Sequence, residues 1–164
     1  MLFNDLYNVK NKEIKKEVMT KRVKTPCIGV CSTGIGDTVC RGCKRFAHEV
    51  INWNGYDESQ RQLVVNRLDA FLTTIVTHKI DIIDEEQLLT QLRYQQVNVD
   101  TDLSPSRWVY ELLRAGSAQI QHTEAYGFRL KPEWQRFSLE EIKQFLDQDF
   151  FTLSSAHYER YISR

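Results

Sequence analysis

Apolar residues recur every three or four positions along most of the chain, which is the spacing of one buried face of an α-helix. The first face consists of Phe46, Val50 and Trp53, and it predicts a short helix that begins near Cys43. A second helix is predicted from Asp57 to about His78. Its apolar face is broad and comprises Leu63 or Val64, Leu68, Phe71, Leu72, Ile75 and Val76. These two faces are expected to pack against each other.

Helix starts are marked by polar residues that satisfy free backbone N–H groups. Asp57 with Gln60, and Ser138 with Glu141, have the spacing of capping boxes. Further helix starts are predicted at Asp84 and at Ser104-Pro105, with proline at the first helical position. The apolar stripes that follow these starts are Leu88, Leu89 and Leu92; Trp108, Val109, Leu112 and Leu113; and Ile142, Phe145 and Leu146.

Three stretches depart from helical spacing. Residues 79–83 predict a connector or a short strand. Apolar and polar residues alternate over 118–122 and again over 126–130, which predicts two short strands that pair as a hairpin. A last short helix is predicted around Tyr158. The predicted fold is therefore mainly α: an N-terminal cysteine loop with two helices, then an α-helical unit that contains a small β-hairpin.

All four cysteines of the chain lie within seventeen residues, at Cys27, Cys31, Cys40 and Cys43. Two disulfides would require an oxidising compartment, and the first residues lack the apolar core and cleavage site of a signal peptide. Four reduced core cysteines are a second interpretation, which the polar, glycine-rich surroundings disfavour. The paired spacing favours a third interpretation, in which four thiolates bind one metal ion or cluster.

The spacing leaves the identity of the metal open. Zinc is bound by four thiolates from paired Cys-x2–4-Cys segments. Iron–sulfur clusters also take four cysteine thiolates at short spacings. Arg41, Lys44 and Arg45 surround the second pair and would offset negative charge in either case.

One stretch resembles a small bacterial family. The sequence PCIGVC at 26–31, the sequence CRGCKR at 40–45, and then Glu49, Val50 and Trp53 are similar to the family catalogued as domain of unknown function 1289. The resemblance covers about residues 25–70. The family is described as predicted iron–sulfur proteins, so the resemblance implies a cysteine-ligated centre. It favours an iron–sulfur cluster at Cys27, Cys31, Cys40 and Cys43, with Zn²⁺ as the alternative.

Charge is unevenly distributed although the net charge is zero. Residues 1–25 form a basic arm with seven basic and three acidic residues, whereas residues 81–164 carry nine basic and fourteen acidic residues. We therefore predict three parts: the arm at 1–25, a cysteine module at 26–79 and an α-rich unit at 80–164. The mostly acidic body argues against a large nucleic-acid footprint.

Known catalytic motifs are absent from the sequence. It has no glycine-rich phosphate loop, dinucleotide fingerprint or serine-nucleophile elbow. No apolar run is long enough to cross a membrane. We therefore predict a cytoplasmic accessory protein, more plausibly not an enzyme, that acts through a protein partner. The alternatives are an electron-transfer or redox-sensing iron–sulfur protein, and a metal module that binds nucleic acid with help from the basic arm.

Overall fold

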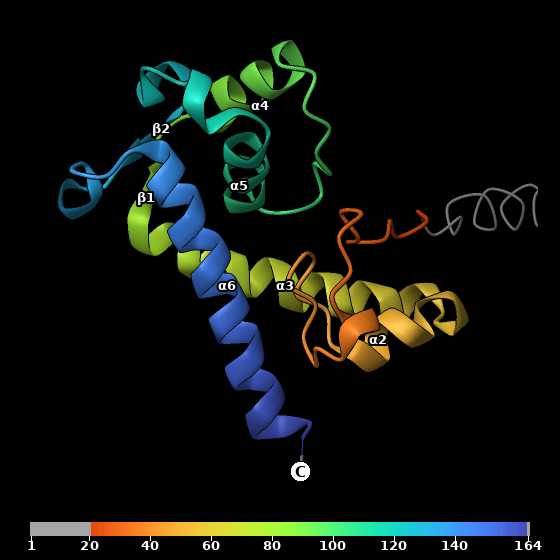
Figure 1. Ribbon diagram of the computed structural model, residues 1–164. Helices are drawn as coiled ribbons and strands as arrows, with labels where there is room; N and C mark the ends of the chain where they lie inside the picture. The colour runs from red at the N-terminus through yellow and green to blue at the C-terminus, as the bar shows by residue number, and fades with distance from the viewer. Residues whose placement is uncertain (1–20, 164) are drawn as a thin grey trace, which may run out of the picture.

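The structure, a computed structural model, describes residues 21–163 (Figure 1). The prediction about the basic arm falls mostly on residues 1–20, outside the described residues. The helices and strands, in chain order, are α2 (Ala47–Asn52), α3 (Glu58–Lys79), β1 (Ile80–Ile82), α4 (Glu85–Tyr94), α5 (Pro105–Gly116), β2 (Phe128–Leu130) and α6 (Leu139–Tyr161). The chain is thus mainly α-helical with one two-stranded sheet, as predicted.

Helix α3 is the longest element of the N-terminal half and packs against both α5 and α6. Figure 1 shows α6 crossing α3. Its start is the predicted capping box, because the Asp57 carboxylate accepts a hydrogen bond from the Gln60 N–H at 2.8 Å and the Gln60 side chain accepts one from the Asp57 N–H. Leu68, Leu72 and Val76 lie at most 1 % exposed on the face turned toward α5 and α6.

One apolar core runs through the segment from α3 to α6, which we call the helical body. The core contains residues from both sides of position 80, such as Leu72 from α3, Leu113 from α5 and Leu146 from α6. Trp53, just after α2, joins the same core. The three-part division remains a prediction about folding units, but it must accommodate a core that α3 shares with the C-terminal helices.

The two strands pair antiparallel, with Ile80 opposite Leu130 and Ile82 opposite Phe128. The predicted antiparallel pair is therefore present, but its first strand is β1 and not residues 118–122. In place of that strand, Ser117–Gln119 forms a 3-10 helix. The pairing follows from the turn at Gly127.

Gly127, the residue just before β2, lies beside the start of α4. Its carbonyl accepts hydrogen bonds from the N–H groups of Ile83 and Asp84, at 2.9 and 3.0 Å. Its φ is +81°, and a Cβ at this position would lie 2.2 Å from the Asp84 carbonyl oxygen. Glycine is required for both reasons. The contact aligns β2 with β1, which continues directly from α3.

Helix α6 is a single helix of 23 residues, so the prediction of a separate last helix is wrong. It begins at the predicted capping box of Ser138 and Glu141. No glycine or proline interrupts residues 139–161, so nothing in the backbone ends the helix earlier. Along its length Ile142, Leu146 and Phe150 are almost fully buried. Within residues 21–163, no helix has the length and apolar character needed to span a membrane.

Candidate metal centre

The second cysteine pair forms a tight turn. The Cys40 N–H donates to the Arg45 carbonyl at 2.9 Å, and the Lys44 N–H donates to the Cys40 carbonyl at 2.8 Å. Val39 and Phe46 then form an isolated β-bridge that closes the turn. Lys44 has a φ of +62°, which is a left-handed conformation incompatible with an α-helix. For this reason α2 begins at Ala47 and not near Cys43 as predicted.

The first cysteine pair packs directly on this turn. A Cβ added to Gly42 would lie 2.2 Å from the Val30 carbonyl oxygen, so only glycine allows the two segments to approach this closely. The Ser32 hydroxyl accepts a hydrogen bond from the Arg41 N–H at 2.9 Å. The Cys40 thiol lies 3.5 Å from the Val30 carbonyl oxygen. We call residues 27–46, which contain both pairs, the cysteine loop.

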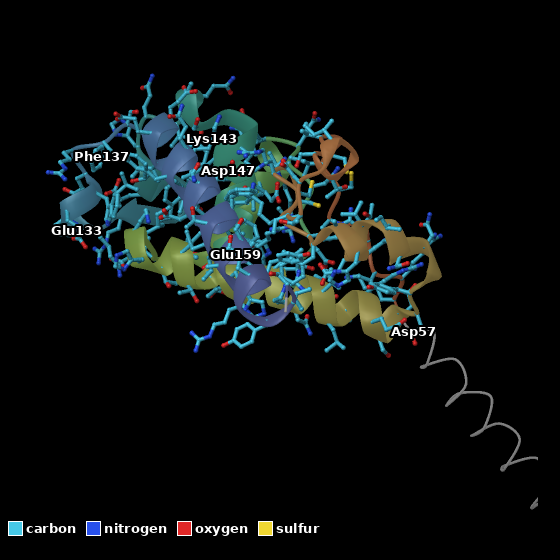
Figure 2. All side chains as sticks on the ribbon, turned by 60° about the horizontal axis from the view of Figure 1, so that its bottom comes forward. Asp57, Glu133, Phe137, Lys143, Asp147 and Glu159 are labelled. Atoms are coloured by element: carbon cyan, nitrogen blue, oxygen red, sulfur yellow. The ribbon has the colours of Figure 1, made fainter. Side chains whose placement is uncertain are left out.

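The four thiols differ in their exposure to solvent. Cys40 and Cys43 are buried, whereas Cys27 and Cys31 are exposed. The sulfur atoms drawn in Figure 2 gather at one corner of the cysteine loop. Among residues 21–163, however, no three His, Cys, Asp or Glu side chains converge in a way that would hold a metal ion. The fold therefore brings the two pairs together without bringing the four sulfurs to one point.

Hydrogen-bond donors are nevertheless directed at several of the sulfur atoms. The Gly29 N–H donates to Cys27 Sγ at 3.4 Å, and the Arg45 Nε–H donates to Cys43 Sγ at 3.3 Å. Burial alone would raise the pKa of Cys40, but backbone hydrogen bonds from Cys43, Ser32 and Gly42 lower it to about 7. Burial raises the pKa of Cys43, and Arg45 opposes that change. Such donors stabilise thiolate, the form that ligates metals.

The donor set fits a four-thiolate centre. Four thiols, and no other side chain of the loop, would supply the ligands that zinc and iron–sulfur clusters share. The exposed pair lies on a segment without regular secondary structure, apart from one 3-10 turn at Thr33–Ile35. Its backbone is therefore free of the helix and sheet hydrogen bonds that would resist movement toward the buried pair.

A buried lysine attaches the loop to the helical body. Lys44 is 0 % exposed, and its ammonium group forms an ion pair with Asp147 of α6. It also donates to the Gly42 carbonyl at 3.2 Å. The same Asp147 oxygen accepts a hydrogen bond from the Tyr110 hydroxyl at 2.8 Å. Burial lowers the pKa of Lys44 while Asp147 opposes that effect. The residue next to Cys43 is thus bonded to α6, and through Asp147 to α5.

A second attachment joins α2 to α3. Both Glu49 oxygens pair with the Arg67 guanidinium, the longer contact being 2.7 Å, and Glu49 also accepts a hydrogen bond from the Phe46 N–H at 2.9 Å. The Arg67 guanidinium lies 4.0 Å from the centre of the Phe46 ring. Arg45 lies in the same way over Trp53, at 4.8 Å. These contacts hold the end of the cysteine loop on the helical body.

Sequence reasoning predicted the four cysteines but missed their attachments. The sequence marks Lys44 and Arg45 only as charges near the cysteines, yet both are buried. Asp147 and Arg67 lie on distant helices and had no local signal. Proximity to Cys43 and the unusual density of charge at 41–45 were the available hints.

Comparison with known proteins finds a family model that is similar to the cysteine segment. Residues 25–72 match the family model described as protein of unknown function (DUF1289). The match to DUF1289 confirms the predicted resemblance and covers the cysteine loop, α2 and most of α3. No curated protein and no solved structure matches the chain. Four cysteines within the matched segment suggest a metal-binding role. Asp147, the ion-pair partner of Lys44, lies outside that segment.

Proposed function

We propose that Cys27, Cys31, Cys40 and Cys43 bind one iron–sulfur cluster, in an accessory protein that acts through a protein partner. The observation that carries the proposal is the packing of the two cysteine pairs on each other, with N–H donors directed at the sulfur atoms. Zn²⁺ is the alternative occupant, since the donor set suits both. The similarity to DUF1289 supports a metal role without distinguishing the two. The thiols must stay reduced, which fits the cytoplasm.

The exposed apolar side chains of the cysteine loop support the proposal of a protein partner. Ile28, Val30 and Ile35 are 40 %, 61 % and 87 % exposed, and two of them flank exposed cysteines. Apolar side chains beside a thiolate centre form a surface that another protein would cover. The same exposure supports electron transfer as a second function, because a centre near the surface exchanges electrons with a docked partner.

Metal content tests the proposal directly. We expect protein purified without oxygen to contain iron and acid-labile sulfide and to absorb broadly in the visible range. A colourless protein with one equivalent of zinc would support the alternative. Serine variants of each cysteine should lose metal, while Thr38→Ser in the same loop should keep it. Full metal occupancy in all four serine variants would refute the assignment.

Gly42 provides a test that leaves every ligand in place. Gly42→Ala forces the two cysteine pairs apart, because the new Cβ would lie 2.2 Å from the Val30 carbonyl oxygen. We expect this variant to lose most of its metal, as measured by elemental analysis. Gly34→Ala is the matched control, since a Cβ there meets nothing within 4 Å. Equal metal content in the two glycine variants would contradict the proposal that packed pairs form the site.

Function tests separate the remaining alternatives. A reversible spectral change on reduction and reoxidation would support electron transfer or redox sensing. Binding to RNA or DNA that weakens steeply with salt would support nucleic-acid recognition through the basic arm. Lys21, the first described residue of that arm, is paired with Asp100 and Asp102 of its own chain. That pairing lowers its availability to phosphate, so we rank this function last.

A further inference from the structure

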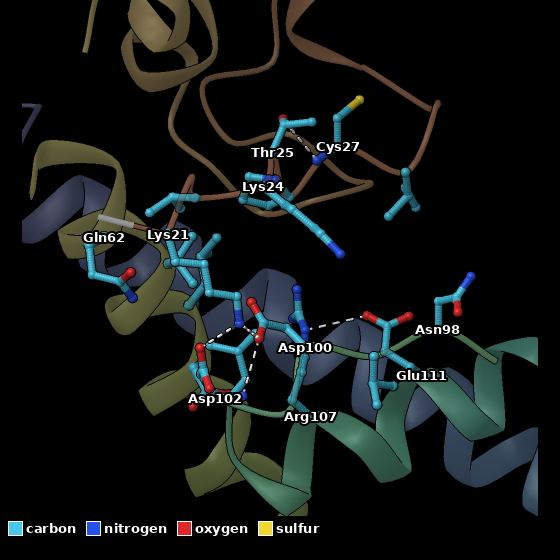
Figure 3. A pocket seen from close by; sticks show the side chains of 18 of the residues that line it. Lys21, Lys24, Thr25, Cys27, Gln62, Asn98, Asp100, Asp102, Arg107 and Glu111 are labelled. Atoms are coloured by element: carbon cyan, nitrogen blue, oxygen red, sulfur yellow. Dashed lines mark hydrogen bonds and ion pairs between the residues drawn. The ribbon is translucent and has the colours of Figure 1, made fainter. Parts of the chain in front are cut away.

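A cavity of about 390 Å³ lies beside the cysteine loop, between the chain segment 21–28, α3 and α5 (Figure 3). We call it the strap cavity, after the segment 21–28 that crosses it. The connection between α4 and α5 contributes the fourth wall through residues 98–103. Its volume falls within the range of pockets that bind small molecules. Of the four proposed metal ligands, only Cys27 is part of its wall.

The strap is attached to the rest of the protein at two points. The Val23 N–H donates to the Glu58 carboxylate at 2.6 Å, and the Val23 side chain packs against the core. Lys21 forms ion pairs with Asp100 at 3.0 Å and with Asp102 at 2.5 Å. Both attachments join the strap to elements of the helical body, so the cavity has walls on each side.

One part of the cavity wall is apolar. Val65 and Leu68 of α3, together with Val23 and Val99, present hydrocarbon to the space and also pack in or against the main core. This part would hold the apolar body of a ligand through the hydrophobic effect.

Another part carries an excess of positive charge. Arg107 and Arg114 share a single carboxylate, that of Glu111, at 3.3 and 2.7 Å. Lys24 lines the same cavity, and among residues 21–163 no carboxylate lies within ion-pair distance of its ammonium group. Figure 3 shows the Lys24 side chain extending across the cavity. These three cations therefore have one carboxylate within ion-pair distance, that of Glu111, and Lys24 also interacts with Asp100 at longer range.

The acidic residues of the cavity already have partners. Asp100 and Asp102 bind Lys21, as described above. Asp69 accepts hydrogen bonds from the Ser104 N–H at 3.1 Å and from the Ser104 hydroxyl at 2.8 Å. These carboxylates therefore accept hydrogen bonds within the protein. Five basic and four acidic side chains line the cavity in all, so its net charge is positive, and the cations around Glu111 retain hydrogen-bond donors for a negatively charged group.

We propose that the strap cavity binds a small organic anion, in which a carboxylate or phosphate is held by Lys24, Arg107 and Arg114 and an apolar body rests on Val65 and Leu68. Arginine suits either group because its planar guanidinium donates two parallel hydrogen bonds. Cys27 lines the cavity, but its sulfur points away from the Lys24 side chain in Figure 3, so the anion would lie beside the cysteine loop and not on its sulfur atoms.

Titration calorimetry on the full chain tests the proposal with four probes. Phenylacetate and phenyl phosphate carry the anion and the apolar body, and they distinguish a carboxylate ligand from a phosphate ligand. Acetate and inorganic phosphate lack the apolar body. We expect saturable binding of at least one aromatic anion and much weaker binding of its small counterpart. Absence of saturable binding by both aromatic anions would overturn the proposal.

Charge variants locate the binding. Lys24 is exposed, so Lys24→Gln should fold normally and weaken the aromatic anion by about fivefold or more. Lys143→Gln on α6 makes the same charge change away from the cavity and should leave binding unchanged. Equal affinity in the two variants would place the anion elsewhere and contradict the proposal. The Cys31→Ser, Cys40→Ser and Cys43→Ser variants change residues outside the cavity wall and should retain binding, which separates this result from the metal assignment.

Discussion

The cysteine loop and the helical body differ in the interactions that stabilise each of them. In the helical body, apolar side chains such as Leu72, Leu113 and Leu146 are completely buried. In the cysteine loop, the apolar side chains of Ile28, Val30 and Ile35 are exposed, and a lysine and an arginine are buried together with Val39 and Phe46. The body is thus stabilised mainly by the hydrophobic effect. The loop depends more on backbone hydrogen bonds and ion pairs, to which the proposed metal would add.

This difference has a general lesson for reading such sequences. A segment that buries charge and exposes much of its hydrocarbon gains less stability from apolar burial, so its order depends more on attachment to a neighbour or on ligation. Here the attachments are Lys44 to Asp147 and Glu49 to Arg67. The following predictions test whether the two regions respond separately to change.

The largest expected effect is in the core of the helical body. Leu72→Ala should lower the free energy of unfolding by about 3–5 kcal/mol, because it leaves a cavity between α3 and the helices packed on it. Leu63→Ala on the same helix is the control. Its side chain is 71 % exposed, so the change should stay within about 0.5 kcal/mol. Urea unfolding measures both values, and similar losses would show that burial does not dominate this region.

The attachment between the regions should give an intermediate effect. Asp147→Ala leaves the buried ammonium group of Lys44 without its carboxylate and removes the acceptor of Tyr110. We expect a loss of about 3 kcal/mol, since an uncompensated buried charge is costly. Lys44→Met should cost less, because it removes the charge and keeps most of the packing. If Lys44→Met proves the more damaging of the two, the ion pair is not what fixes the loop.

The smallest effect on global stability should come from metal removal. Stripping metal from the protein should raise hydrogen exchange first in residues 26–55, whereas amides of α5 and α6 should keep their protection. Ordering the loop backbone costs about 1–2 kcal/mol per residue, and the proposed ligation would offset part of that cost. Because α3 shares its core with α5 and α6, we expect α3 to stay protected as well. Uniform loss of protection would mean that the loop and body fold as one unit.

Local signals predicted the helices well. Asp57, Asp84, Ser104 and Ser138 all cap helices as expected, because each supplies an oxygen to an N–H group only three residues away. The predicted packing of the Phe46 face on α3 is met only at Trp53, which joins the core shared by α3. The Phe46 ring instead contacts His157 and Tyr158 of α6, and it meets α3 through the guanidinium of Arg67. Helix caps depend on residues that are close in the sequence, so they can be predicted without knowledge of the fold.

Features that depend on distant residues could not be predicted. The pairing of β2 with β1 depends on the contact of Gly127 with Asp84, which is 43 positions away in the sequence. The alternation over 118–122 was a weak signal, since Ile120 is buried there while His122 is exposed. Likewise, four clustered cysteines predicted a site, but the burial of Lys44 depends on a carboxylate contributed by α6.

The ion pair between Lys44 and Asp147 also constrains the order of events during synthesis. The two residues are separated by 103 positions, so the lysine is made well before its partner exists. At about 5–20 residues per second, the interval is roughly 5 to 20 s. Throughout that time the nascent cysteines have no α6 to cover the neighbouring turn. Metal insertion during translation would therefore meet an open loop, whereas insertion into the finished chain must act through the exposed pair, Cys27 and Cys31.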